Sequence, residues 1–144
     1  MEKKTILFID DQPSWSRLTR AAIEDADYEV ILARDAREIE ELIDGRKDDI
    51  DLIVLDIIMG TKNSDFSAVE TNAGKKTGFL IWERIIKKRL PKTPVIVITN
   101  LSKDTKTGKE VYTALEKENV PVYLKPFLPS FLVDIIRKQL GDLQ

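Results

Sequence analysis

The chain has 144 residues, of which 42% are hydrophobic and 33% charged, and its 23 basic and 25 acidic residues leave a net charge of −2. This balance gives no general attraction to nucleic acid or to anionic lipid, so we expect neither as a partner. Cysteine and histidine are absent, which excludes disulfides, thiolate chemistry and any nucleophile that depends on histidine.

The chain shows no sign of export or membrane insertion. Its first residues lack the charged and then apolar pattern of a secretory signal, and no apolar run reaches the length of a membrane span. We therefore expect a cytoplasmic protein that makes no membrane contact. Its length predicts a single domain over residues 1–144.

Short runs rich in β-branched residues alternate with longer amphipathic runs, which predicts strands that alternate with helices. The expected elements, in chain order, are strand 5–9, helix 14–26, strand 28–33, helix 35–45, strand 51–55, helix 77–90, strand 94–98, helix 105–118, strand 121–124 and helix 129–140. Asp35 is expected to cap the second helix. Repeated strand–helix units predict an α/β fold, a five-stranded parallel sheet with helices on both faces in a three-layer sandwich.

One segment interrupts this alternation. Residues 60–77, GTKNSDFSAVETNAGKKT, are polar and follow the third strand directly. A loop of this length inside a compact domain is typically functional or mobile.

Polar side chains collect where the predicted strands end. In an open parallel sheet, ligands bind beyond the carboxyl ends of the strands, so these residues are expected to share one edge. They are Asp10 and Asp11 after the first strand, Asp56 after the third, Thr99 and Asn100 after the fourth, and Lys125 at the end of the fifth. The first and third strands are expected to be neighbours, about 5 Å apart. Adjacent carboxylates repel one another, which predicts a positive occupant between them.

The motifs FIDDQPS, LIVLDIIM, VIVITN and YLKPF, in this order, resemble the receiver domain of bacterial response regulators along nearly the whole chain. The resemblance implies a flavodoxin-like sheet with strand order 2-1-3-4-5. It also implies one receiver domain over residues 1–144, with an insertion at about 60–77. Such a domain is a signalling module rather than a metabolic enzyme, although it catalyses its own phosphorylation and dephosphorylation.

The resemblance implies a magnesium site. Asp11, Asp56 and the backbone carbonyl of Ile58 would hold Mg²⁺, and Asp10 would act on the ion through water. Mg²⁺ takes oxygen ligands, keeps several waters and bridges to phosphoryl oxygens. The ion would neutralise the clustered carboxylates and would then screen the incoming phosphoryl group.

The resemblance also implies the parts of a phosphoryl-transfer site. Asp56 would accept the phosphoryl group from a histidine kinase or a phosphotransfer protein. Lys125 would pair with Asp56 at rest and with the phosphoryl oxygens afterwards, while Thr99 would donate a hydrogen bond to one of them. The downstream partner would be a protein that binds the last two helices and the fifth strand.

Several positions depart from the family pattern. The family commonly has proline where this chain has Gly60, and its next glycine matches Gly78 only after an insertion of roughly fourteen residues. Asn100 stands where a small residue is usual. Val122 stands where an aromatic residue usually forms the switch. Strand alternation places the neighbouring Tyr123 on the opposite face of the sheet, so we expect phosphorylation to be retained and its transmission to be modified.

Each polar residue also has a structural interpretation. Asp10 and Asp11 are compatible with a turn and a helix cap, and Asp56 with a turn. Thr99 is a common residue type at strand ends, and Lys125 is compatible with a solvated surface charge. These interpretations lead to the alternative hypothesis, a pseudo-receiver that binds partners without being phosphorylated.

Enzymes with a related fold fit the sequence less well. A flavin carrier needs a neutral phosphate loop after its first strand, where Asp10 and Asp11 would repel the phosphate. Phosphatases of the haloacid dehalogenase type have Asp-x-Asp at the nucleophile, whereas Asp56-Ile57-Ile58 in this chain lacks the second acid. Trp82 is expected in the core, whereas Trp15 is compatible with the core or with a docking surface.

Overall fold

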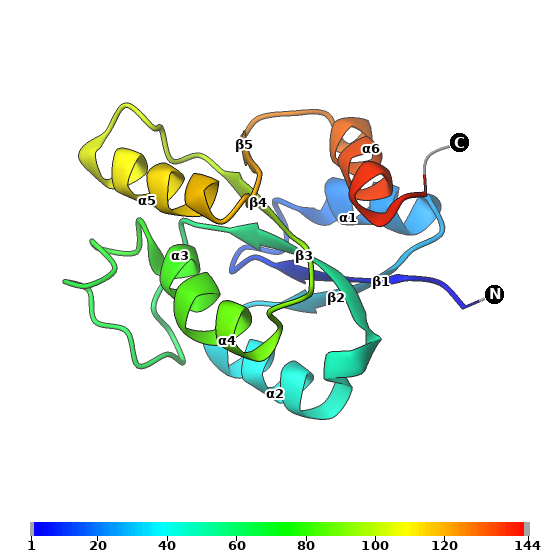
Figure 1. Ribbon diagram of the computed structural model, residues 1–144, viewed down its shortest axis with the longest axis horizontal. Helices are drawn as coiled ribbons and strands as arrows, with labels where there is room; N and C mark the ends of the chain where they lie inside the picture. The colour runs from blue at the N-terminus through cyan, green and yellow to red at the C-terminus, as the bar shows by residue number, and fades with distance from the viewer. Residues whose placement is uncertain (1, 143–144) are drawn as a thin grey trace.

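The computed structural model describes residues 2–142 as a five-stranded sheet between two layers of helices (Figure 1). The strands are β1 (Thr5–Ile9), β2 (Glu29–Ala33), β3 (Ile50–Asp56), β4 (Val95–Thr99) and β5 (Val122–Leu124). They are parallel and lie in the order β2-β1-β3-β4-β5. The predicted fold class and strand order are therefore confirmed, and β1 and β3 are neighbours as expected.

Helices cover both faces of the sheet. They are α1 (Arg17–Asp25), α2 (Ala36–Arg46), the short 3₁₀ turn η1 (Lys47–Asp49), α3 (Thr77–Ile81), the π-helical turn η2 (Trp82–Ile86), α4 (Lys87–Arg89), α5 (Lys106–Lys117) and α6 (Pro129–Leu140). Helices α1 and α6 contact one another and bury one face, whereas α2, α3 with η2, and α5 bury the other (Figure 1). Within residues 2–142, no helix combines the length and the apolar character that crossing a bilayer requires.

The strands are apolar because both of their sides are covered. Every residue of β1 is buried. Ile6 and Phe8 face the core layer beneath α1 and α6, whereas Leu7 and Ile9 face the layer beneath the other helices. This burial on two sides explains why the strand reads as a continuous apolar run rather than an alternating one.

Several predicted boundaries shift by a few residues. Asp56 and Thr99 are the last residues of β3 and β4, instead of following those strands. The first helix begins at Arg17 rather than at residue 14, because Pro13 to Ser16 form a turn in which the Pro13 carbonyl accepts a hydrogen bond from Ser16 Oγ. Asp35 caps α2 as predicted, accepting a hydrogen bond from the Glu38 N–H.

The predicted helix 77–90 is interrupted by a π turn. Residues Trp82–Ile86 form a wider turn between α3 and α4. A π turn inserts one extra residue and rotates the helix that follows it. Trp82, Ile85 and Ile86 are all buried in this turn, and the expectation that Trp82 belongs to the core is confirmed.

The polar insert, defined here as residues 60–76, forms turns and no helix or strand. It lies beside α3 and α5, at the left in Figure 1. Side-chain contacts attach it to α2, to η2 and to α5: Asn63 to Asp35 at 2.8 Å, Glu70 to Arg84 at 2.8 Å, Asn72 to Thr107 at 2.6 Å and Lys76 to Glu110 at 3.0 Å. The insert is therefore anchored along its length.

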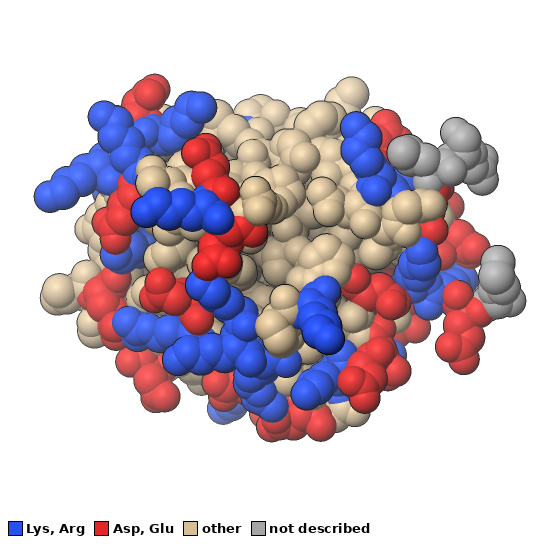
Figure 2. All heavy atoms as spheres, in the orientation of Figure 1, with Lys and Arg blue, Asp and Glu red and all other residues tan. Residues whose placement is uncertain are grey.

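Charges of both signs are mixed on the surface that Figure 2 shows. Basic and acidic side chains alternate over the helices at the lower part of this face, and uncharged residues occupy much of its centre. Because opposite charges lie close together, this face creates only a weak long-range field.

The two ends of the described chain meet around Asp142. Lys4 Nζ lies 2.7 Å from Asp142 Oδ1 and also donates to the Leu140 carbonyl at 3.2 Å. The buried Tyr28 donates its hydroxyl to Asp142 Oδ2 at 3.0 Å. Burial, helped by this hydrogen bond to a carboxylate, raises the pKa of Tyr28 from 10.0 to about 12. The cluster fastens the end of α6 to the start of β1 and β2.

Replacing Tyr28 by phenylalanine should lower stability at neutral pH by about 1 kcal/mol, the usual net value of one hydrogen bond. Folding raises the pKa of Tyr28, so the folded state keeps the phenolic proton more tightly than the unfolded state does. The advantage of the wild type over Tyr28→Phe is therefore complete below pH 10 and is lost as the pH rises toward 12. Urea unfolding of both proteins across this range measures the difference, and a gap that stays constant to pH 12 would contradict the assignment.

Candidate functional site

Three predicted acids and the predicted lysine line one cavity. It has a volume of about 480 Å³ and lies at the carboxyl ends of the strands. Its lining residues are Asp10, Asp11, Gln12, Trp15, Asp56, Ile58, Met59, Gly60, Ala73, Gly74, Asn100 and Lys125. Because β1, β3 and β5 run parallel, their last residues reach the same edge of the sheet, as the sequence predicted.

Asp56 and Lys125 form an ion pair inside this cavity. Lys125 Nζ lies 2.7 Å from Asp56 Oδ2, and the Ile58 N–H donates to Asp56 Oδ1 at 3.2 Å. The Asp56 residue is only 6% exposed. Burial raises the pKa of Asp56 above its ordinary value of 3.8, and the nearby charge of Asp10 adds to this effect. Lys125 and the Ile58 N–H favour the ionised form but do not cancel the effect of burial.

The adjacent carboxylates of Asp10 and Asp11 are held by different donors. Asp10 is buried, and its Oδ1 accepts a hydrogen bond from the Gln12 N–H at 2.9 Å. Asp11 is partly exposed, and its Oδ2 accepts a hydrogen bond from the Gly60 N–H at 2.8 Å. Separate backbone donors therefore hold the two negative groups where β1 ends.

The acids do not form a complete metal cage by themselves. Among residues 2–142, no three acidic side chains are grouped closely enough to surround an ion. The charged groups that line the cavity are three carboxylates and one ammonium, and the sequence contains no histidine or cysteine. Oxygen donors of this kind suit a hard cation that completes its coordination with water or with a ligand.

Thr99 lies behind the wall of the cavity rather than on its surface. Its side chain is fully buried, and its Oγ1 accepts a hydrogen bond from the Leu101 N–H at 3.0 Å. Its carbonyl accepts the Lys125 N–H at 2.8 Å, which joins the end of β4 to the lysine. Among the predicted site residues, Thr99 is the one that does not line the cavity, whereas its neighbour Asn100 does.

The cavity also contains residues that the sequence did not single out for it. Ala73 and Gly74, from the end of the insert, lie at its edge. Together with Asn72 they have φ values of 52°, 56° and 87°, which form a left-handed turn. Asn and Gly favour this conformation and so signal the turn, but the sequence carries no signal that the turn folds over the acids.

Trp15 borders the same cavity and is 77% exposed, which resolves its assignment against the core. Leu18, three residues further along the chain, is 72% exposed. Trp15 belongs to the turn before α1, and Leu18 to the first turn of that helix. The cavity therefore has one large exposed aromatic side chain at its border, that of Trp15.

Val122 and Tyr123 occupy opposite faces of the sheet, as strand alternation predicted. Val122 packs with the core layer that includes α5, whereas Tyr123 packs with the layer that includes α6. The Tyr123 ring meets Phe131 edge to face, with 5.6 Å between centroids. The aromatic side chain of β5 is therefore engaged with α6.

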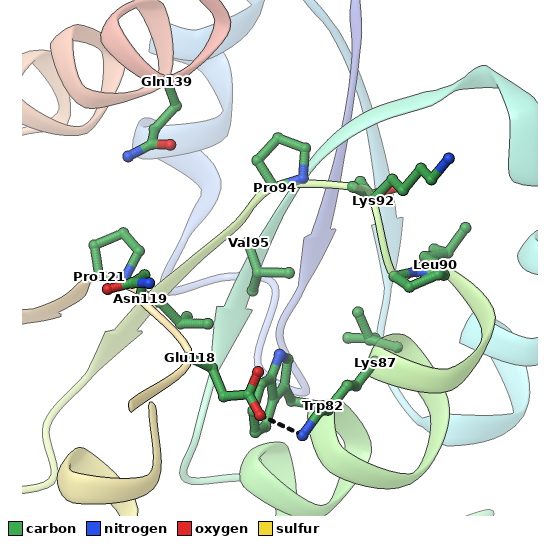
Figure 3. A pocket seen from close by; sticks show the side chains of 14 residues that line it. Trp82, Lys87, Leu90, Lys92, Pro94, Val95, Glu118, Asn119, Pro121 and Gln139 are labelled. Atoms are coloured by element: carbon green, nitrogen blue, oxygen red, sulfur yellow. Dashed lines mark hydrogen bonds and ion pairs between the residues drawn. The ribbon is translucent and has the colours of Figure 1, made fainter. Parts of the chain in front are cut away.

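A second cavity, of about 270 Å³, lies at the opposite edge of the sheet (Figure 3). It is lined by residues that precede β4 and β5, among them Pro94 and Pro121. Lys87 reaches across it to Glu118 at 2.5 Å, beside the ring of Trp82 (Figure 3). Ligands of parallel sheets bind at the carboxyl ends of the strands, which favours the first cavity as the functional site.

Comparisons with known proteins agree with this geometry. A family model described as the response regulator receiver domain matches residues 6–137. No curated protein matches the chain. A receiver domain protein from Methanospirillum hungatei JF-1 is 22% identical, with a TM-score of 0.66 over 97% of this chain and 95% of that chain.

Two bacterial structures are similar to the same extent. A response regulator from Thermotoga maritima is 21% identical, with a TM-score of 0.69 over 96% of this chain and 98% of that chain. The receiver domain of NtrX from Brucella abortus is 22% identical, with a TM-score of 0.71 over 96% of this chain and 99% of that chain. At these identities the structures show a shared fold, and the family model extends over most of the sequence. The chain therefore belongs to the response regulator receiver domain family.

Proposed function

We propose that this receiver domain accepts a phosphoryl group on Asp56 from a histidine kinase or a phosphotransfer protein in the cytoplasm. The observation that carries the proposal is the buried Asp56–Lys125 ion pair, 2.7 Å long, in a cavity that Asp10 and Asp11 also line. A buried carboxylate with an ammonium beside it and two more acids nearby is arranged for charge-dependent chemistry rather than for stability. We take residues 1–144 as one such domain.

Asp56 is the proposed nucleophile. One of its carboxylate oxygens attacks the phosphorus of the donor, a bond from that oxygen to phosphorus forms, and the bond from phosphorus to the donor nitrogen breaks. The donor imidazole leaves with the electron pair of that bond. Lys125 pairs with the carboxylate before transfer and with the phosphoryl oxygens after it, which stabilises the charge in both states. Water later hydrolyses the aspartyl phosphate and returns Asp56 to its starting form.

The residues present fit Mg²⁺. Asp11, Asp56 and the Ile58 carbonyl are its proposed ligands, with Asp10 acting through water. Magnesium sites commonly use one or two carboxylates together with waters and phosphoryl oxygens, so an incomplete cage of protein ligands suits this ion. When bound, the ion supplies positive charge that offsets the clustered acids and the transferred group.

Two exposed surfaces support the proposed partners. Trp15 lines the cavity, where a phosphodonor protein must approach Asp56, and Leu18, three residues further along the chain, is exposed as well. At the end of β5 and the start of α6, the side chains of Leu124, Leu128 and Phe131 are exposed. Exposed apolar residues of this size are typical of protein contact surfaces. We assign the first surface to the donor and the second to a downstream protein.

Labelling by a small acyl phosphate tests the proposal. With Mg²⁺ present, intact-protein mass spectrometry should detect the addition of one phosphoryl group, and fragmentation should place it on the peptide that contains Asp56. With a chelator in place of Mg²⁺, the gain should disappear. A protein that gains no mass in either condition would instead be a pseudo-receiver, which binds partners without phosphorylation.

A further inference from the structure

The peptide that joins Met59 to Gly60 contacts the candidate cation site. Its N–H, contributed by Gly60, donates to Asp11 Oδ2 at 2.8 Å. Its carbonyl, contributed by Met59, accepts a hydrogen bond from Thr77 Oγ1 at 2.7 Å. One peptide plane is therefore held at both ends, by a proposed metal ligand on one side and by a buried threonine hydroxyl on the other.

The end of the insert holds the preceding peptide, which joins Ile58 to Met59. The Met59 N–H donates to the Gly74 carbonyl at 3.1 Å, and the Met59 side chain is buried. Gly74 has a φ of +87°, and a Cβ at this position would lie 2.7 Å from the Met59 carbonyl oxygen. Glycine is required here because the backbone approaches so closely in a left-handed conformation. The insert therefore closes against the residue that directs the Gly60 N–H.

We propose that the Met59–Gly60 peptide is a positioning element of the cation site, which fixes the carboxylate of Asp11 before the ion binds. This inference depends on the proposed role of Asp11 as a ligand. The terminal torsion of an aspartate is broad, so an unrestrained Asp11 would sample many orientations. A donor that holds one oxygen removes this freedom in advance, and hydrogen bonds to ligating carboxylates support metal affinity in this way.

The contact contributes to binding rather than to folding. The Gly60–Asp11 hydrogen bond is exposed to solvent, where water replaces a lost partner at little cost. A Cβ on Gly60 would meet Asp11 Oδ2 at 3.5 Å, which is ordinary van der Waals contact. Alanine at this position therefore keeps both the space and the N–H, whereas proline removes the N–H.

The experiment compares Gly60→Pro with Gly60→Ala in the full chain. Calorimetric titration with Mg²⁺ alone, without phosphodonor, should give wild type and Gly60→Ala affinities within about twofold, and roughly tenfold weaker binding for Gly60→Pro. Thermal unfolding in chelator should be nearly the same for the three proteins. Mg²⁺ affinity equal to or tighter than wild type in Gly60→Pro would overturn the proposal, because the N–H would then be neutral or a competitor of the ion.

Thr77→Val provides a second variant that leaves Gly60 intact. It removes only the hydroxyl at the other end of the peptide and should weaken Mg²⁺ binding in the same direction. If Gly60→Pro does not fold, Thr77→Val decides, and wild-type affinity in it overturns the proposal. A wild type that binds no Mg²⁺ would overturn both this inference and the proposed function. Wild-type binding that neither variant weakens overturns the inference alone.

Discussion

Replacing Asp56 by asparagine should abolish phosphoryl transfer to the chain completely. Asparagine keeps the shape of the side chain but offers no carboxylate oxygen to attack phosphorus. The mass gain seen with an acyl phosphate and Mg²⁺ should therefore be lost. The exposed Asp48, replaced by asparagine in the same way, is the control and should keep the full gain. Labelling that persists in Asp56→Asn would show that another residue accepts the phosphoryl group.

The same substitution should raise the thermal stability of the protein in chelator. Burial raises the pKa of Asp56, so its contribution to stability is complete below its ordinary pKa of 3.8 and is lost as the pH rises through the folded value. At neutral pH the ionised carboxylate therefore opposes folding, although Lys125 offsets part of the cost. A gain of about 1 kcal/mol would raise the unfolding temperature by roughly 4 °C. Equal unfolding temperatures in chelator would contradict this reading.

The polar residues at the carboxyl ends of the strands could be predicted, because their position depends only on the apolar run that comes directly before each of them. A continuous apolar run identifies a buried parallel strand, and the residue that ends it must emerge at the carboxyl edge. That rule was sufficient to bring Asp10, Asp56 and Lys125 together. The alternation of β5 likewise predicted that Val122 and Tyr123 face opposite sides. Strand order came from the resemblance, since apolar runs do not identify their neighbours.

Features that depend on long-range contacts could not be predicted. Thr99 lies at the carboxyl end of β4 as predicted, but its side chain is fully buried and does not line the cavity, because burial depends on what the rest of the fold places around the strand end. The insert was expected to be functional or mobile, but its anchors lie on helices distant in sequence, such as the contact from Asn72 to Thr107. Its closing turn at Gly74 meets Met59 only because both ends of the insert return to the same place.

A large loss of stability is expected from substitution of Gly78, where α3 packs directly against the end of β3. A Cβ at Gly78 would lie 2.0 Å from the Asp56 carbonyl oxygen and 2.7 Å from Ile57 Cα, and the Gly78 N–H donates to the Ile57 carbonyl at 2.8 Å. Such distances cannot be tolerated without moving the backbone. Gly78→Ala should therefore destabilise the chain by about 3 kcal/mol, a fall of roughly 10 °C in the unfolding temperature.

Gly45→Ala is the matched control, because it adds the same methyl group to another helix, where no atom beyond the neighbouring helix backbone lies within 4 Å. Alanine favours the helical conformation there, so this variant should be more stable than wild type by about 0.5–1 kcal/mol. If the same glycine-to-alanine change lowers stability at Gly78 and raises it at Gly45, the contact of Gly78 with β3 is the cause of the loss. The backbone that Gly78→Ala displaces carries Asp56, so phosphoryl labelling should also fall in the folded fraction of that variant, whereas Gly45→Ala should label as wild type does. If Gly78→Ala were as stable as Gly45→Ala, the close contact between α3 and β3 would be wrong.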